Sequence, residues 1–467
     1  PLLYKQGFRG TVYATEATCD LCGILLRDAA HIQMSEAEWK GRKAARAGQP
    51  APEPLYTLED VEGVLRLLRP CGYGKRIQVG ENIIIRFTDV GHLLGSACIE
   101  AWLTEGGTEK KIVFSGDIGN TDQPIIRDPQ TVSGADYVLI ESTYGDRNHT
   151  EVWSYTDELA EIIDETLGKG GNVVIPSFAV GRTQELLYFI REIKDQKLVK
   201  STPNFPVYID SPLAKAATTV FCGDLHGYLD EQALELVKDG THMFTFPNLN
   251  LVESSEESKM LNMDTTPKVI ISASGMCDAG RIRHHLKHNL WKPECTIVFV
   301  GYQGEGTLGR SLLEGVRSVK LFGEEIAVHA KIVNFQGLSS HADRDHLLAW
   351  IADIKAPKPQ HVFIVHGDRE VAPYFAESVE KLGFTAHAPQ YTEIYDLIDD
   401  KIVAPGYLPE RKAKAVGGQR VSSAYERLVA LGQRMVDVIR RSKGRDNKTL
   451  GRWADQLRQL LDKWEES

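Results

Sequence analysis

Gly91-His92-Leu93-Leu94-Gly95-Ser96-Ala97 and Ser115-Gly116-Asp117-Ile118-Gly119-Asn120 are the two stretches that decide how this chain folds. Each follows a run of β-branched and aromatic residues, 83–90 and 112–114, and such runs predict buried strands. The small residues after each strand allow the backbone to turn and leave one polar side chain, His92 or Asp117, at the strand end. A histidine and a carboxylate on neighbouring loops suggest a metal site, although on these two residues alone turn or hydrogen-bonding roles are favoured.

The length, the composition and the net charge of the chain indicate the class of protein. A chain of 467 residues is too long for one ordinary core and predicts roughly two to four domains. Its 42% hydrophobic and 25% charged residues are typical of a globular protein, and no apolar run approaches the ~18 residues of a membrane span. The net charge of -10 argues against binding nucleic acid through the overall field, but it leaves room for a local basic channel.

The seven cysteines are scattered and odd in number, which argues against a disulfide framework and predicts a reducing, cytoplasmic setting. The pair in Cys19-Asp20-Leu21-Cys22 has no second pair to complete a zinc knuckle. A redox or metal role for it and a plain helical turn both stay open.

The pattern along the first part of the chain alternates between helix and strand. Residues 11–14 predict a buried strand, and a helix is expected from Thr15. Residues 31–54 are charged, end in a proline-rich run and predict an exposed insertion. Thr57 is an N-cap candidate for a helix to about Leu68, and the alternation over 77–114 predicts antiparallel strands.

The rhythm changes at about residue 154. Strands over 172–176, 207–210, 268–271 and 296–300 are separated by helical segments, which predicts a parallel-sheet domain from about 150 to 330. The strand pattern then returns over 326–333, and a buried strand over 360–365 ends at His366. A strand-rich core is therefore expected to be interrupted by an α/β domain and then completed.

The tail from residue 406 has a different composition. It contains 14 Lys and Arg against 8 Asp and Glu, a net charge of +6. Residues 421–441 and 450–464 each place large apolar residues at helical spacing. A hairpin that forms a homodimer or touches RNA and a hairpin packed on its own protein are both compatible with this pattern.

Five motifs stand in a fixed order along the chain: Gly91-His92, Ser115-Gly116-Asp117, Glu141-Ser142-Thr143-Tyr144-Gly145-Asp146-Arg147, Ser339-Ser340-His341-Ala342-Asp343 and Val365-His366-Gly367-Asp368. Together they resemble the β-CASP branch of the metallo-β-lactamase superfamily. These nucleases include the cleavage and polyadenylation endonuclease and bacterial and archaeal RNA-processing enzymes such as the ribonuclease J group. The resemblance covers residue 1 to about 400.

The resemblance implies a fold and its domains. Residues 1–150 and 331–405 are expected to form a metallo-β-lactamase domain, an αββα sandwich of which the first part is missing from this sequence. Residues 151–330 are expected to form the inserted β-CASP domain with a parallel sheet. Residues 406–467 are expected to be a helical extension.

The resemblance also implies an active centre with two zinc ions. His92, Asp117 and His366 match metal ligands, and Asp117 is expected to bridge the ions. Glu141 and His341 match a carboxylate that orients a histidine and the histidine that protonates the leaving oxygen. Zinc lowers the pKa of bound water, so a zinc-bound hydroxide is expected to attack the phosphorus of the substrate.

Further motifs suit phosphate binding in a cleft between the domains. The expected substrate-binding residues are Ser274, Gly275, Arg281, Gly309 and Arg310, because small residues expose backbone N–H groups and arginines add charge. Ordinary tight turns are the alternative for these glycines. Arg182, at the start of a predicted helix, has a structural alternative as well.

One departure from the family's pattern is large. The His-x-His-x-Asp-His run that supplies four ligands in relatives is absent from this sequence. We expect it to precede Pro1 in the complete protein, and the rival explanation is a noncatalytic RNA-processing homologue without zinc. The predicted function is a zinc-dependent, cytoplasmic nuclease that cleaves RNA, or single-stranded DNA, internally or from the 5′ end; hydrolysis of small esters on the same fold is the third alternative.

Overall fold

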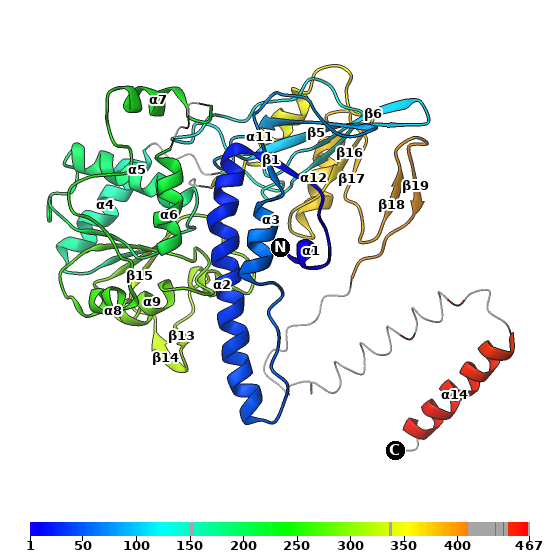
Figure 1. The fold of residues 1–467 in the computed structure, drawn as a ribbon. Coiled ribbons are helices and arrows are strands. Elements are labelled where there is room, and N and C mark those ends of the chain that lie inside the picture. The colour runs from blue at the N-terminus through cyan, green and yellow to red at the C-terminus, as the bar shows by residue number, and fades with distance from the viewer. Residues whose placement is uncertain are drawn as a thin grey trace. The chain divides into compact units, whose positions relative to one another are not determined.

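The computed structural model describes residues 1–149, 154–223, 225, 227–335, 339–409, 435, 442 and 447–465. The chain divides into two compact units, Pro1–Gly406 and Tyr407–Ser467. The first unit contains two large sheets with their helices, and the inserted segment builds the second of these sheets (Figure 1). This arrangement confirms the predicted class, a mixed sheet interrupted by a parallel-sheet α/β domain.

The first sheet has seven strands in the order β17-β16-β7-β6-β5-β4-β3. Neighbours from β3 to β6 are antiparallel, as the alternation over 77–114 predicts, and β6, β7, β16 and β17 are parallel. The strands are β3 (Ile77–Gly80), β4 (Ile83–Asp89), β5 (Ala97–Glu105), β6 (Thr108–Phe114), β7 (Tyr137–Ile140), β16 (His361–Ile364) and β17 (Ala386–His387).

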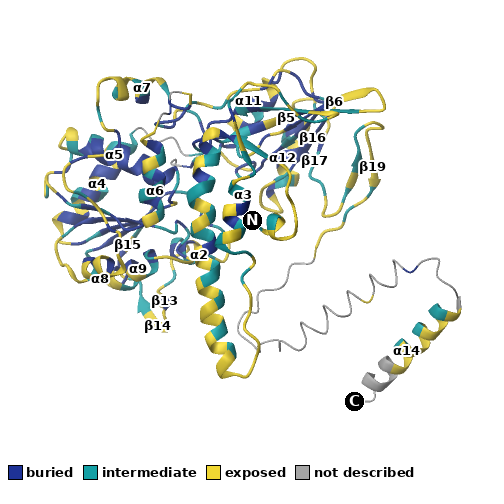
Figure 2. Cartoon of the chain, viewed as in Figure 1, coloured by how far each residue is buried: buried dark blue, intermediate teal, exposed yellow. Residues whose placement is uncertain are grey.

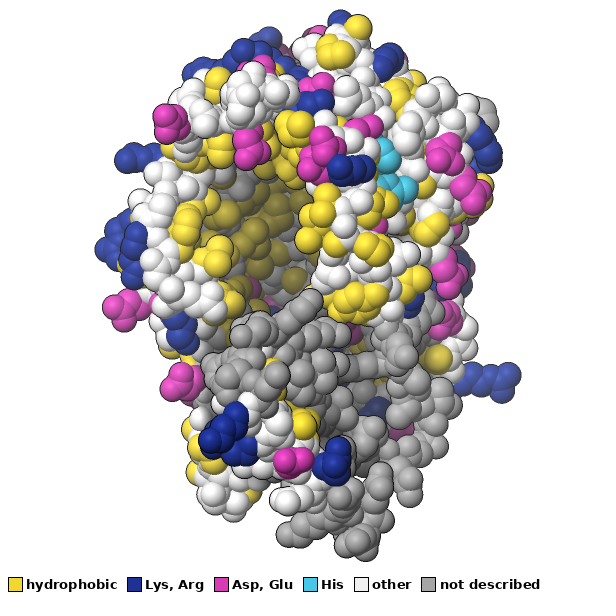
Figure 3. Space-filling model, turned by 90° about the vertical axis from the view of Figure 1, so that its right-hand side faces the viewer, with side chains coloured by type: hydrophobic (Ala, Val, Ile, Leu, Met, Phe, Trp, Pro, Cys, Tyr) yellow, Lys and Arg dark blue, Asp and Glu magenta, His cyan; other side chains and the backbone are white. Residues whose placement is uncertain are grey.

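The two faces of this sheet are covered differently. Helices α11 (Arg344–Ala352) and α12 (Val371–Glu380) bury one face in a core that includes Val113 and Val138. On the opposite face, Ile99 and Phe114 remain 37% and 40% exposed. Hydrophobic side chains also line a hollow on the side of the molecule drawn in Figure 3.

The second sheet has six parallel strands in the order β10-β9-β11-β8-β12-β15. Val173 and Ile175 of β8 enter one core and Val174 enters another, so both faces are buried. This double burial explains the continuous apolar runs in the sequence. The strands are β8 (Val173–Pro176), β9 (Val207–Ile209), β10 (Leu249–Leu251), β11 (Val269–Ser272), β12 (Thr296–Phe299) and β15 (Lys331–Asn334).

Helices surround the six-stranded sheet (Figure 1). They are α4 (Tyr155–Gly168), α5 (Arg182–Asp195), α6 (Pro212–Phe221), α7 (Glu231–Lys238), α8 (Ser255–Met263), α9 (Ile282–Asn289) and α10 (Leu308–Leu313). Since β15 belongs to this sheet, its last strand lies just beyond the predicted domain boundary at 330. The strand predicted over 326–333 is divided between β15 and β14 (Glu324–Ala327), which pairs with β13 (Ser318–Leu321).

The N-terminal elements include one long helix. After α1 (Leu2–Lys5) and β1 (Val12–Thr15), helix α2 runs over Glu16–Arg46, and its distal half is largely exposed (Figure 2). Most of the predicted insertion is therefore exposed, as expected, but it is helical. Helix α3 (Leu58–Leu65) begins with a capping box between Thr57 and Asp60. It precedes β2 (Leu68–Cys71), which pairs with β1.

The remaining elements lie late in the chain. β18 (Ile394–Asp396) and β19 (Lys401–Ala404) form a hairpin, and α14 spans Asn447–Glu465, where the sequence predicts the second tail helix. The helix predicted over 421–441 lies almost wholly outside the described residues. Among the helices that are described, none has both the length and the hydropathy of a membrane span.

Candidate metal centre and active site

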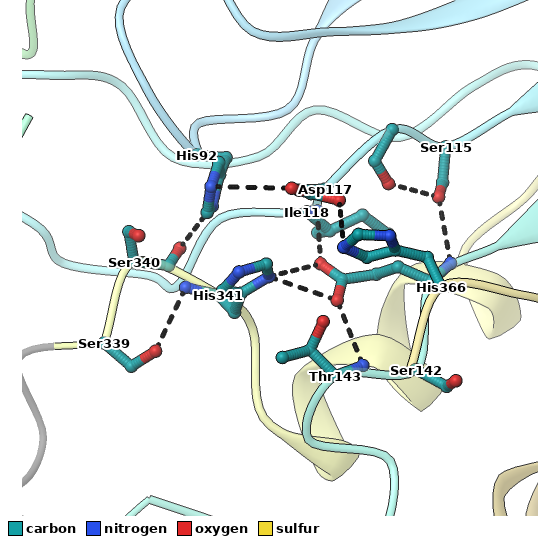
Figure 4. Close-up of polar contacts among 12 residues, drawn as sticks. His92, Ser115, Asp117, Ile118, Ser142, Thr143, Ser339, Ser340, His341 and His366 are labelled. Carbon is teal, nitrogen blue, oxygen red and sulfur yellow. Dashed lines mark hydrogen bonds and ion pairs between the residues drawn. The ribbon is translucent and has the colours of Figure 1, made fainter. Parts of the chain in front are cut away.

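Four polar side chains lie at the same end of the seven-stranded sheet because each follows one of its strands. His92 follows β4, Asp117 follows β6, Glu141 follows β7, and His366 follows β16. His341 reaches them from the loop before α11. Figure 4 shows His92, Asp117, His341 and His366 converging. The structure therefore brings together all the residues for which the sequence predicts catalytic or metal-binding roles.

Asp117 lies between two imidazoles. Its Oδ2 is 3.8 Å from His92 Nε2, and its Oδ1 is 3.3 Å from His366 Nε2. The rings of His92 and His341 lie 4.4 Å apart, measured between centroids. One carboxylate thus faces a histidine on each side, which is the arrangement expected of a shared metal ligand.

The backbone fixes the tautomer of His92. Its Nδ1 lies 3.1 Å from the carbonyl oxygen of Ser340 and donates to it, because a carbonyl can only accept. The lone pair is therefore on Nε2, the nitrogen that faces Asp117. Burial, assisted by the nearby His341, lowers the pKa of His92 to about 4, so the ring is neutral at physiological pH and competent as a ligand.

Glu141 orients His341. The carboxylate is 1% exposed and accepts from His341 Nδ1 at 3.1 Å and from the backbone N–H groups of Ile118 and Thr143 at 2.6 and 3.2 Å. Burial acts to lower the pKa of His341, but the hydrogen bond and charge of Glu141 outweigh it and raise that pKa above its ordinary value. His341 therefore holds a proton more readily than His92 does.

Backbone hydrogen bonds join the loops that carry these side chains. The Ser340 carbonyl accepts from Asn120 N at 2.9 Å as well as from His92, and Ala342 N donates to Ile118 O at 2.8 Å. Gly119 forms an isolated antiparallel bridge with His341. Hydrogen bonds thus join the loop before α11 to the loop after β4, which carries His92, and to the loop after β6, which carries Asp117.

His366 has an unusual backbone conformation. Its φ is +47°, in the left-handed region that residues with a side chain rarely adopt. The next residue, Gly367, packs so closely against Ser142 that a Cβ there would overlap the Ser142 hydroxyl. The imidazole remains 63% exposed while its Nε2 points to Asp117. A strained residue held in place by its neighbours is frequent at functional sites.

The donor set fits a metal ion. Ligand atoms of His92, Asp117 and His341 all lie within 4.8 Å of one another, and within the described ranges no other three His, Cys, Asp or Glu side chains do so. Imidazole nitrogens and carboxylate oxygens are the donors that catalytic zinc sites use, commonly three from the protein with a position left open. The chemistry of these residues therefore suits zinc.

Two families match parts of the chain. The Beta-Casp domain matches residues 183–312, and the Zn-dependent metallo-hydrolase RNA specificity domain matches residues 325–389. Ribonuclease TTHA0252 of Thermus thermophilus is 37% identical over 370 residues, which cover 79% of this chain and 78% of that protein. The chain belongs to the β-CASP family. The recognition made from the five motifs is confirmed, and the family is one of metal-dependent hydrolases.

Two archaeal relatives extend the comparison of this β-CASP protein. The RNase J-like protein of Methanocaldococcus jannaschii is 31% identical and matches 79% of each chain. The transcription termination factor FttA of Pyrococcus abyssi is 30% identical over 83% of this chain. The match covers 58% of the length of that factor.

The substrate-binding residues predicted for this β-CASP protein do not share one cavity. Ser274 lines a cavity of about 480 Å³ together with His92 and His341. Arg310 lines a second cavity of about 370 Å³, which shares Gly301, Tyr302 and Ser339 with the first. Arg281 faces a groove beside α2.

Arg281 is engaged within the protein. Its guanidinium donates to Asp210 Oδ1 at 2.7 Å and to the Glu253 carbonyl at 2.8 Å. Gly275 and Gly309 have structural neighbours, since they pack against Phe178 and Gln303. The predicted phosphate-binding roles of all five residues stay predictions.

Several contributing residues of the β-CASP protein are missed by sequence reasoning. The Ser96 hydroxyl accepts from His92 N at 3.0 Å, and the Ser115 hydroxyl accepts from Glu141 N at 3.1 Å. Glu185 is also missed; it forms a buried ion pair at the start of α5 with Arg182, a residue that the sequence does single out. The serines lie within the quoted motifs, so proximity to His92 and Asp117 is the signal that could have found them.

Proposed function

We propose that this chain is a metal-dependent ribonuclease in which Asp117, His92 and His366 hold the metal and His341 protonates the leaving oxygen. The observation that carries the proposal is the Glu141–His341 pair, in which the oriented histidine itself belongs, with His92 and Asp117, to the only close group of candidate ligands in the described residues. A proton donor next to a metal is what phosphodiester hydrolysis requires, because the departing alkoxide is strongly basic.

Each side chain has a defined task in this proposal. Glu141 accepts from Nδ1 of His341 and so directs Nε2 toward the reacting groups. Its charge also keeps the proton on the imidazole, which supports a role as general acid. When bound, zinc neutralises charge on the phosphate and lowers the pKa of water toward neutrality. His92 and Asp117 contribute the neutral nitrogen and the carboxylate that such an ion needs.

The proposal includes two zinc ions in the complete protein. The family resemblance supports two zinc ions in the complete protein, with Asp117 between them. The described residues offer His92, Asp117 and His366 as ligands, and an open catalytic zinc site uses three. A second ion requires ligands in addition to these.

RNA is the proposed substrate. The relatives named above include a ribonuclease and an RNase J-like protein, and the family that matches residues 325–389 carries an RNA specificity domain. Single-stranded DNA is the weaker alternative. A homodimer and a cytoplasmic setting are proposed from the basic tail and from the odd number of cysteines.

Labelled RNA tests the proposal directly. The full chain, loaded with zinc, is incubated with single-stranded RNA, with DNA of the same sequence and with small esters, and its zinc is counted. We expect RNA cleavage that a chelator stops and zinc restores. Ester turnover without cleavage of either nucleic acid would instead indicate a small-molecule hydrolase. A folded chain with less than one zinc and no cleavage would indicate a noncatalytic homologue.

A further inference from the structure

The cavity that contains His92 and His341 has two ends of different chemistry. At one end lie the two imidazoles with Ser339 and Ser340. The rest of the wall is mainly apolar and includes Leu25, Leu93, Phe178, Leu213, Met276 and Val300, together with Tyr302, Ser274 and Arg182. Its volume of about 480 Å³ lies within the range of small-ligand sites.

Phe178 is, with Leu25 at 37%, one of two large apolar residues of this wall that remain exposed, and its own exposure is 43%. It follows β8 at the end of the strand, where a polar or small residue would be cheaper to expose. Burying a phenylalanine side chain stabilises a protein by roughly 1.5–3 kcal/mol, so leaving it open forgoes much of that gain. An exposed aromatic inside a cavity indicates a binding role.

Phe178 is also held rigidly. Its carbonyl oxygen accepts three hydrogen bonds: from Thr183 Oγ1 at 2.7 Å, from Ser177 Oγ at 3.2 Å and from Thr183 N at 3.3 Å. One side of its ring lies on Gly275, where a Cβ would be 3.0 Å from the ring carbons Cδ2 and Cε2. The backbone that carries the ring is therefore anchored, and Gly275 leaves room for one side of the ring.

The charges around the cavity decide which part of a nucleotide fits there. Arg182 is the single Lys or Arg among the described lining residues, and Glu185 already neutralises it in a buried pair. Nothing in the apolar part of the wall is suited to a phosphate. A nucleobase suits it, because a base presents flat, weakly polar faces, and an aromatic side chain stacks on any of the four bases.

We propose that Phe178 stacks on the base of a nucleotide adjacent to the scissile phosphate, with that base in the apolar part of the cavity and the phosphate at the His92 and His341 end. The inference rests on the proposed function, which it makes more specific. Phe178 would position the substrate. Its ring would recognise the flat face of a base and would therefore show little preference for the sequence of the RNA. The alternative is that the ring only supports the turn at Gly275.

The first experiment pairs a protein variant with a modified substrate. Phe178→Ala and Phe178→Tyr are compared with the wild type on a short RNA with one cleavage site and on matched RNAs that lack one base on either side of that site. Loss of one base–aromatic stack should lower kcat/KM about tenfold or more in Phe178→Ala, and the tyrosine variant should stay near the wild type.

The decisive result is the coupling between variant and substrate. We expect one abasic RNA on which the wild type and Phe178→Ala are cleaved equally, because the stack is then absent from both. An equal loss on every RNA would overturn the proposal and assign Phe178 to supporting the Gly275 turn. Wild-type kcat/KM in Phe178→Ala would also overturn it. Phe322→Ala, which removes a phenylalanine that is 51% exposed on the β13–β14 turn, is the matched control and should behave as the wild type.

A spectroscopic measurement keeps the inference separate from catalysis. The fluorescent base 2-aminopurine replaces the base next to the cleavage site, and the RNA is bound to a His341→Ala protein so that it stays intact. Stacking on Phe178 should quench the fluorescence, and adding Phe178→Ala should restore it. Unchanged quenching in the double variant would overturn the inference even if RNA is cleaved. Failure of the wild type to cleave any RNA would refute the proposed function instead.

Discussion

His92 and His341 are neighbours with opposite properties, and their hydrogen-bond partners explain the difference. A neutral carbonyl accepts from His92, whereas the Glu141 carboxylate accepts from His341. Burial lowers the pKa of His92 to about 4, and Glu141 raises the pKa of His341 against the effect of burial. Near pH 7 one ring is prepared to hold a metal, and the other holds a proton more readily.

Replacing His341 separates these two roles. His341→Ala should lower the cleavage rate by about 10²- to 10⁴-fold, the usual contribution of a general acid, while the zinc content stays nearly unchanged. Metal analysis and single-turnover cleavage of the same preparation measure both quantities. His329→Ala is the control. It removes an exposed histidine just before β15 and should change neither the zinc content nor the cleavage rate. If His341→Ala also loses zinc, His341 is a ligand and its assignment as the acid is wrong.

A buried carboxylate near the metal loop predicts a dependence of stability on pH. Burial raises the pKa of Asp89 to about 6, although Gly91 N and Arg127 act in the other direction. The folded protein therefore binds this proton more tightly than the unfolded chain does. The Asp89 contribution to stability is present below pH 4 and is lost as pH rises through about 6, a loss of roughly 3 kcal/mol.

Asp89→Asn should remove that loss, since an amide keeps an acceptor for Gly91 N without carrying charge. We expect the variant to be more stable than the wild type at pH 7 by up to about 3 kcal/mol and similar to it near pH 4. Urea unfolding at the two pH values measures the difference. A variant that is less stable at pH 7 would show that the Arg127 ion pair outweighs the cost of burial.

At the scale of elements, the centre depends on how closely three loops approach one another. Gly119 N donates to Val90 O at 2.7 Å, and Asn120 N donates to Ser340 O at 2.9 Å. Gly119 lies directly against the backbone of Gly91 and His92. A glycine is needed there because backbone atoms, unlike the ends of flexible side chains, cannot move aside cheaply.

Gly119→Ala should therefore push the His92 loop away from Asp117. We expect zinc affinity to fall by at least about tenfold, as for loss of a group that positions a ligand, with a matching loss of cleavage. Isothermal titration with zinc measures the first effect. Gly227→Ala places a Cβ in open space and serves as the control. Wild-type zinc affinity in Gly119→Ala would mean that the loops tolerate a wider separation.

Local pattern predicts most elements of this fold, and the exceptions have physical causes. The exposed half of α2 is rich in Ala, Glu, Lys and Arg, which are strong helix formers. Helix propensity therefore indicates a helix in this segment, whereas its charge alone predicts an exposed insertion. β2 contains Pro70, and because proline is unfavourable within strands the local sequence does not predict one there. The pairing of β2 with β1 is decided by tertiary contacts. The assignment of β15 to the second sheet depends on its partner β12, which no local pattern reveals.

For the candidate site, the sequence predicts the motif side chains but not the groups that surround them. Motif order identifies His92, Asp117, Glu141, His341 and His366, because strand ends bring such residues to one edge of a sheet. The Ser340 carbonyl and the Phe178 ring have no such signature. A carbonyl is present at every residue, and an exposed phenylalanine cannot be told from a buried one before the cavity is known.

At the scale of the whole molecule, the metal would connect segments that are far apart in sequence. Zinc on His92, Asp117 and His366 would link three loops of one sheet, and His341 comes from beyond the inserted domain. Binding to the folded state alone raises its stability by about 2.7 kcal/mol when free zinc exceeds the dissociation constant a hundredfold. Metal and fold should therefore stabilise each other.

Removal of the metal tests this coupling. A chelator should abolish RNA cleavage and lower the Tm of the full chain by on the order of 5 °C, and added zinc should reverse both changes. Differential scanning fluorimetry with parallel activity assays follows the titration. Magnesium at the same concentration should restore neither, because it prefers an octahedral shell of oxygen ligands. A Tm that is independent of zinc would contradict a site formed by these loops.

The distance along the chain between the parts of the centre has a consequence for synthesis. Ser340, whose carbonyl orients His92, lies 248 residues further along the chain, and His366 follows later still. A ribosome releases the chain from its N-terminal end, so the loops of His92 and Asp117 leave it well before Ser340 and His366 do. The centre can therefore form only after the inserted α/β domain and the segment that follows it have been synthesised.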